Sequence, residues 1–206
     1  MSIRAITLET PDPAAAQDFY AALGVAVPVG LRASTAPTSG FRGFTLSLLV
    51  PQPSTVDALV GAAQAAGAAV LKPVAKSFWG YGGVVASPDG SIWKVATSSK
   101  KEVGADPTTI DDVVLLLGVE DVKASKRFYV EHGLAVKRRF GSRYVEFDAP
   151  ASSIKLALYR RRALAEDAGV PAEGTGSHRI ALTSDLGSFT DPDGFAWELT
   201  TVAATT

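Results

Sequence analysis

The sequence has no cysteine among its 206 residues and only two histidines. The absence of cysteine excludes disulfide bonds, thiolate metal sites and a cysteine nucleophile. No apolar run is long enough to span a membrane, and the first residues lack the basic and apolar regions of a signal peptide. The formal net charge is −1, which gives no general attraction to nucleic acid. We therefore expect a cytoplasmic protein with neither a membrane nor a nucleic acid as partner.

Hydrophobic residues make up 47% of the chain, which is enough for a substantial core, and the length suits one or two small domains. The polar stretch "TSSKKEVGADPTT" at 97–109 is typical of a linker. We predict one half over residues 1–100 and a second half over residues 108–203.

The two halves repeat the same sequence landmarks. A helical pattern that ends at glycine occurs twice at an offset of 109, where four pairs match: Asp12/Asp121, Phe19/Phe128, Tyr20/Tyr129 and Gly24/Gly133. "SGFRGFTLSL" (39–48) is similar to "GSHRIALTSD" (176–185), where Gly40 matches Gly176 and Leu46 matches Leu182 at an offset of 136. "SPDGSIWKV" (87–95) matches "DPDGFAWEL" (191–199) at an offset of 104. The changing offsets indicate that the halves are duplicates with complementary deletions.

The order of these landmarks resembles the vicinal oxygen chelate superfamily, which includes glyoxalase I, bleomycin-resistance proteins and extradiol dioxygenases. The resemblance implies an α+β fold of tandem βαβββ modules, which we name A, B, A′ and B′ in chain order. Module B (about 40–100) and module A′ (about 110–174) have every element. Module A lacks its last strands, so that 29–40 is expected to be a loop, and B′ lacks its helix.

In glyoxalase-like and bleomycin-resistance-like dimers, module A of one chain and module B of the other form a cup that holds the ligand. The same pairing within this chain would join A′ with B in a whole cup and A with B′ in a degenerate one. The alternative pairing, A with B and A′ with B′, would leave both cups damaged. The fused chain is compatible with a monomer or a homodimer.

Metal-dependent members of the superfamily hold their ion with His and Glu side chains on the first and last strands of each module. The corresponding positions here are Ala5, Gly43, Lys94, Val114, Lys155, Arg179 and Glu198. Only Glu198 is a usual ligand. His178 lies one residue from the matching position, so on a strand it would face away. We therefore expect no metal and no cofactor, and we predict an ion pair between Glu198 and Arg179.

Period-two alternation assigns the faces of the predicted strands. It places Trp93 and Trp197 in the core. The candidate ligand contacts in the A′/B cup are Phe78, Trp79, Tyr81, Lys94, Tyr144, Glu146, Lys155 and Tyr159. Aromatic surface with a few convergent polar groups is typical of a small-molecule site. The alternative is that these side chains fill the barrel and leave no vacancy. The basic runs 137–139 and 160–162 are expected to be solvated strand ends.

Three functions remain open. The first is metal-free binding of a small organic ligand, such as an antibiotic or a metabolite, in the A′/B cup. The second is a metal-dependent lyase, isomerase or dioxygenase of the glyoxalase or extradiol type, which rests on the fold alone. The third is a structural or partner-binding protein whose cups are filled. Whether the protein is an enzyme stays open, and the shortage of His and Glu at the metal-ligand positions argues against a metalloenzyme.

Overall fold

The computed structural model describes residues 3–24, 29–78, 80–148, 152, 154–185 and 187–200. Unit A comprises β1 (Ile3–Thr10), α1 (Pro13–Ala22) and β2 (Val29–Ala33), and β3 (Thr38–Gly40) follows it. Unit B comprises β4 (Phe44–Leu49), α2 (Pro53–Ala65), β5 (Ala69–Ser77), β6 (Gly80–Ala86) and β7 (Ile92–Thr97).

The second half repeats this order. Unit A′ comprises β8 (Asp112–Val119), α3 (Val122–Glu131), β9 (Ala135–Phe140), β10 (Tyr144–Asp148) and β11 (Ile154–Arg160). A connection with α4 (Arg161–Ala168) and β12 (Gly174–Gly176) leads to unit B′, which comprises β13 (Ile180–Ser184), β14 (Phe189–Thr190) and β15 (Ala196–Leu199). Across the described parts of the chain, no helix combines the length and apolarity needed to cross a membrane.

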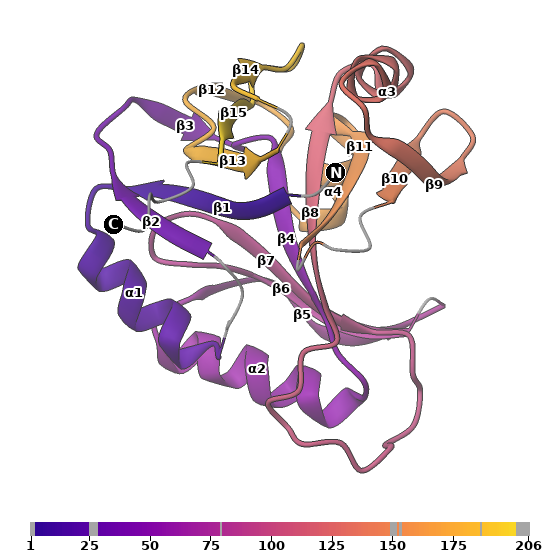
Figure 1. Cartoon of the computed structure of the whole chain (residues 1–206). Helices are drawn as coiled ribbons and strands as arrows, with labels where there is room; N and C mark the ends of the chain where they lie inside the picture. The colour runs from indigo at the N-terminus through magenta and orange to yellow at the C-terminus, as the bar shows by residue number, and fades with distance from the viewer. Residues whose placement is uncertain are drawn as a thin grey trace, which may run out of the picture.

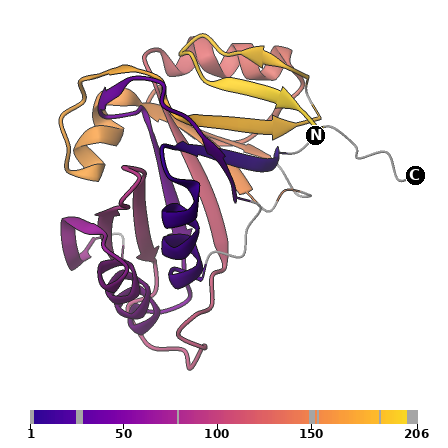
Figure 2. The same ribbon diagram turned by 90° about the vertical axis from the view of Figure 1, so that its left-hand side faces the viewer.

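Strand pairing crosses between the two halves (Figure 1). The eight-stranded sheet has the order β5-β6-β7-β4-β8-β11-β10-β9, in which β4 of B pairs antiparallel with β8 of A′. The five-stranded sheet has the order β14-β15-β13-β1-β2, in which β13 of B′ pairs antiparallel with β1 of A. The predicted pairing of A′ with B and of A with B′ is confirmed. The strands of the two sheets run in different directions, and α1 and α2 lie side by side (Figure 2).

The missing helix of B′ is confirmed, but the deletion in A differs from the prediction. Residues 185–188 separate β13 from β14, and four residues are too few for the missing helix. The stretch 29–40, expected as a loop, instead contains β2 and β3. Strand β2 pairs parallel with β1, as β7, β11 and β15 pair with the first strands of their units, so unit A keeps a last strand and lacks the strands before it. Strand β3 pairs with β12 in a small sheet. Pairing satisfies backbone groups that β1 would otherwise leave open at a sheet edge, which is the physical reason for the difference.

The duplicated helices start in the same way. The side chain of Asp12 accepts hydrogen bonds from the backbone N–H groups of Ala14 and Ala15, both at 3.1 Å. Asp121 accepts the corresponding bonds at the start of α3, from residues 123 and 124. A carboxylate at this position satisfies N–H groups that have no partner within the helix. The matched aspartates of the repeat are therefore helix caps.

Aromatic pairs hold the two units of each half together. Tyr20 on α1 lies against Trp93 on β7, with ring centroids 5.4 Å apart and an interplanar angle of 52°. Tyr129 on α3 lies against Trp197 on β15 at 5.4 Å and 54°. Trp93 is 0% exposed and Trp197 is 2% exposed. The prediction that both tryptophans belong to the core is confirmed, and the repeated geometry shows the duplication in three dimensions.

Candidate functional site

Alternate residues of the eight-stranded sheet face α2 and α3, and the others form what we call the inner face. Helix α4 covers part of the inner face. Its apolar side chains Leu164, Ala165 and Ala168 are buried in one cluster with Phe41, Val84 and Ile92. A Cβ atom at Gly118 on β8 would lie 3.1 Å from the Cα atom of Arg161, so this glycine lets the helix approach the sheet closely. The A′/B cup is therefore partly filled by a segment of the chain itself.

An open cleft of about 550 Å³ remains beside α4. Lys72 comes from β5, Arg143 precedes β10, and Tyr159 and Arg160 end β11. The polar side of α4 completes the lining with Arg162, Ala163, Glu166 and Asp167. Four cationic side chains thus face two carboxylates, and Asp167 already pairs with Lys94 at 2.7 Å. The cleft carries an excess of positive charge.

Five predicted contact residues lie on the inner face, and one of them lines the cleft. Tyr144 and Tyr159 are Cα partners on β10 and β11, and their ring centroids are 6.2 Å apart. Tyr159 lines the cleft, whereas Lys94 borders it only through Asp167. Lys155 forms an ion pair with Asp112 at 2.5 Å and has no place in the lining.

The buried carboxylate of Glu146 forms ion pairs with two basic side chains. Glu146 is 5% exposed, and its carboxylate lies 3.1 Å from Nζ of Lys137 and 2.7 Å from Nε of Arg138. Burial alone would raise the pKa of Glu146, but the hydrogen bonds from these cations outweigh burial and lower it. Burial, followed by the nearby Glu146 charge, raises the pKa of Tyr144 to about 12. Glu146 and Tyr144 therefore stabilise the sheet edge and lie beside the cleft.

The aromatic wall predicted from residues 76–83 does not form as expected. Tyr81 faces α2, where its hydroxyl donates to the carboxylate of Asp57 at 2.8 Å. This placement corrects its assignment to the cup. The sequence indicates a loop around Tyr81, but this residue lies on β6. Regular pairing of Tyr81 with Thr97 and of Val85 with Trp93 puts its side chain on the helix-facing side of the sheet. Phe78 is 83% exposed and does not line the cleft. Trp79 lies outside the described residues.

The residues present do not fit a divalent metal ion. Lys94, Ser47, Val114 and Lys155 are successive Cα partners in one row across β7, β4, β8 and β11. The row occupies the middle strands, at or next to the positions that the resemblance implies for metal ligands, and it offers no His or carboxylate. Ser47 holds the place that we had assigned to Gly43, which lies before β4. Within the described ranges, no group of three or more His, Asp or Glu residues could hold a metal ion.

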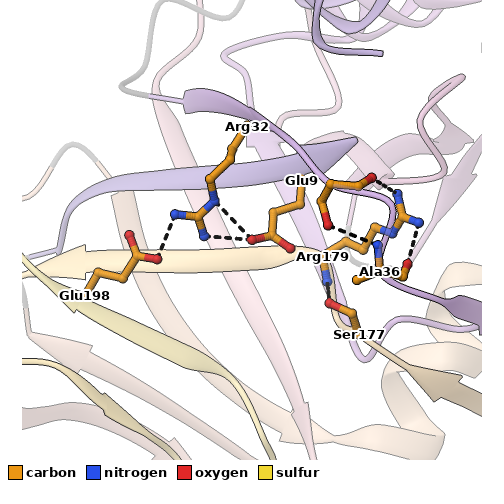
Figure 3. A network of polar contacts seen from close by, with 7 residues as sticks. Glu9, Arg32, Ala36, Ser177, Arg179 and Glu198 are labelled. Atoms are coloured by element: carbon orange, nitrogen blue, oxygen red, sulfur yellow. Dashed lines mark hydrogen bonds and ion pairs between the residues drawn. The ribbon is translucent and has the colours of Figure 1, made fainter. Parts of the chain in front are cut away.

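Glu198 belongs to a different network, on the five-stranded sheet (Figure 3). Arg32 on β2 donates to Glu198 at 2.9 Å and to Glu9 at 2.7 Å. Glu198 therefore has an arginine partner, but the predicted partner, Arg179, is wrong. Arg179 precedes β13, has φ of 54°, and donates to the carbonyl oxygens of Ser34 and Ala36. The backbone conformation of Arg179 turns its side chain out of the row that alternation assigns.

His178 also has partners that exclude it as a metal ligand. Its Nδ1 lies 2.5 Å from the carbonyl oxygen of Arg42, and its Nε2 lies 3.0 Å from that of Asp193. Its ring stacks on Phe195 at 4.0 Å. The matching residue of the first half, Arg42, donates to the carbonyl oxygen of Asp89. The two side chains thus hold equivalent turns in the two halves, which is a structural role.

Sequence reasoning missed most of the cleft. Arg143, Arg160, Arg162 and Lys72 were not among the candidates, and α4 was not expected to cover the cup. The run 160–162 was the available signal, but a basic run alone does not distinguish a solvated strand end from a lining. The run lines the cleft because it lies where β11 ends and α4 begins, which the sequence did not reveal.

The fold is similar to that of glyoxalase I and of a related solved structure. Glyoxalase I from Zea mays superposes with a TM-score of 0.62 at 14% identity, over 96% of this chain and 91% of that chain. A protein from Bacillus subtilis subsp. subtilis str. 168, provisionally described as a dioxygenase, also gives a TM-score of 0.62 at 14% identity, over 97% of this chain and 84% of that chain. At such identities the likeness is one of fold. No family model and no curated protein matches the sequence.

Proposed function

We propose that the protein binds a small organic anion in the cleft between α4 and unit A′, without a divalent metal. The observation that carries the proposal is the lining, in which Tyr159 occurs together with four cationic side chains: Lys72, Arg143, Arg160 and Arg162. A few polar groups that converge beside aromatic surface are typical of ligand sites. Positive charge favours carboxylate or phosphate groups and disfavours a cationic antibiotic.

Two alternatives have less support. A metal-dependent lyase, isomerase or dioxygenase requires three or four ligands in the row that Lys94, Ser47, Val114 and Lys155 occupy. A purely structural protein is favoured by the burial of α4 on the inner face. A cup filled for structural reasons alone would not, however, need four cations around the space that remains.

A thermal-shift screen tests the proposal. Small aromatic and aliphatic carboxylates, phosphates and amines are added to the purified protein at low ionic strength. A ligand at ten times its Kd stabilises the protein by about 1.4 kcal/mol, which raises the Tm by about 3–5 °C for a chain of this size. Anions are expected to give a saturable rise and amines none. A panel in which no anion raises the Tm would contradict the proposal.

Two matched tyrosine variants locate the site. Tyr159→Ala removes the ring that lines the cleft, whereas Tyr81→Ala removes a ring from the opposite face of the sheet. The Tm rise with the best anion is expected to shrink in Tyr159→Ala and to persist in Tyr81→Ala, each measured against its own ligand-free protein. The reverse result would place the ligand elsewhere.

A further inference from the structure

We infer that the natural ligand is a phosphomonoester of a small planar compound, whose phosphoryl group lies among Arg143, Arg160 and Arg162. The inference rests on the function proposed above and narrows its ligand class. Two observations carry it: the cleft itself, and the arginines in its lining that form no ion pair with a carboxylate that the structure describes.

Basic side chains elsewhere on the inner face have carboxylate partners. Lys94 pairs with Asp167 and Lys155 with Asp112, while Lys137 and Arg138 share Glu146. In contrast, Arg143, Arg160 and Arg162 line the cleft, and no carboxylate of the described residues is within ion-pair distance of them. Glu166 and Asp167 also line the cleft, but neither is paired with one of these three arginines, which leaves that role to a ligand.

Three short segments bring these arginines to one place. The backbone N–H of Arg160 donates to the carbonyl oxygen of Arg143 at 3.3 Å, where β11 ends beside the start of β10. Arg162 follows in the first turn of α4. Arg161, between them, is turned away and donates to the carbonyl oxygens of Phe41 at 2.6 Å and Ala172 at 3.1 Å. The change from strand β11 to helix α4 therefore directs two arginines of the run into the cleft and one into the protein.

The start of α4 is unfavourable without an anion. No side chain caps it, and its first turn contains two arginines and no acidic residue. Cations are disfavoured at a helix N-terminus, where the backbone N–H groups already carry partial positive charge. A local conflict of this kind is expected at a functional site rather than in a purely structural segment. An anion in the cleft would compensate both the arginines and the helix.

The excess charge distinguishes among anions. Once Asp167 is paired with Lys94, Glu166 is the remaining carboxylate among Lys72 and the three arginines. A carboxylate or sulfonate supplies one negative charge, whereas a phosphomonoester carries about −1.5 to −2 at pH 7. Its oxygens also match the forked donors of arginine. A dianionic phosphoryl group therefore fits the lining better.

Adjacent rings indicate the rest of the ligand. The ring of Tyr159 lines the cleft. The centroid of the Tyr144 ring lies 6.2 Å from that of Tyr159, and the centroid of the Phe140 ring lies 5.8 Å from that of Tyr144. Phe140 is 63% exposed, so the row of rings leads from the cleft toward solvent. A flat group attached to the phosphate can stack along this row.

The test uses phenyl phosphate as the probe, with benzoate, benzenesulfonate and inorganic phosphate as comparators, in calorimetric titrations of the full chain at pH 7.5 and low salt. Phenyl phosphate is expected to bind at least about tenfold more tightly than each comparator. Arg143→Gln and Arg162→Gln are each expected to weaken it by about tenfold or more, the range for a lost charge-assisted hydrogen bond. Arg139→Gln makes the same charge change on the neighbouring strand outside the lining, and is expected to change the Kd less than about twofold.

Each other outcome is decisive. If benzoate binds in a Tyr159-dependent manner but phenyl phosphate binds no more tightly, the inference fails while the proposed function stands. If inorganic phosphate binds as tightly as phenyl phosphate, the arginines hold an adventitious ion only. Equal losses in Arg139→Gln and Arg143→Gln would show general charge attraction and overturn the placement, as would the absence of binding by the wild-type protein.

Discussion

Replacing Trp93 tests whether the duplicated core is correctly assigned. The indole is 0% exposed on β7 and packs against Tyr20, so Trp93→Ala leaves a cavity between α1 and the eight-stranded sheet. Truncation of a buried tryptophan costs about 3–5 kcal/mol in the free energy of unfolding. For a chain of this size, that loss lowers the Tm by roughly 6–20 °C.

The assay is urea unfolding followed by circular dichroism, with Trp197→Ala as the matched variant in the second half. Trp197 is buried to nearly the same extent, and its Nε1 also donates to the hydroxyl of Tyr129 at 3.3 Å. Trp197→Ala is therefore expected to lose at least as much stability as Trp93→Ala. A loss below about 1 kcal/mol in either variant would refute the core assignment of that ring. A fully stable Trp93→Ala protein with impaired ligand binding would show that its face is reversed.

Three more results are expected. Gly118→Val should displace α4 and weaken anion binding, because a Cβ atom at this position would lie 3.1 Å from the Cα atom of Arg161, and it should also strain the turn at Gly43, whose carbonyl oxygen would lie 2.9 Å away; hydrogen exchange of α4 unchanged from the wild type would contradict this. The lowered pKa of Glu146 means that its stabilising effect is present above its usual value of 4.5 and is lost as the pH falls through the folded-state pKa. Wild-type urea midpoints should therefore fall toward those of Glu146→Gln below about pH 4.5, and a constant difference would be inconsistent with the shift. Chelation with EDTA should leave both the Tm and anion binding unchanged, whereas near-stoichiometric zinc, nickel, iron or manganese in the purified protein would contradict the metal-free proposal.

The two sheets explain why a duplicated chain can tolerate complementary deletions. Strand pairing puts the two complete units, B and A′, into one sheet, and puts the two shortened units, A and B′, into the other. The missing helix of B′ and the missing strands of A therefore fall on the same side of the molecule. The sheet that carries the cleft keeps all eight strands.

Sequence alone determined the duplication, the type of each unit and the core tryptophans. These features depend on local signals: Asp12 and Asp121 cap helices through their own neighbouring N–H groups, and both tryptophans follow a Pro-Asp-Gly turn at the same spacing, Trp93 on a strand whose buried residues alternate. Signals of this kind arise between residues close in the sequence, so they do not depend on how distant parts of the chain pack.

Only the tertiary structure decided what lines the cleft. Glu198 meets Arg32 rather than Arg179 because Arg179 lies before its strand with positive φ. Tyr81 reaches Asp57 because it lies on β6, paired with Thr97, on the helix-facing side of the sheet. The burial of α4 on the inner face depends on contacts between residues far apart in the sequence, such as Leu164 with Val84. Sequence periodicity reports which side of an element is apolar, but not which other element will cover it, because that choice is made by long-range packing.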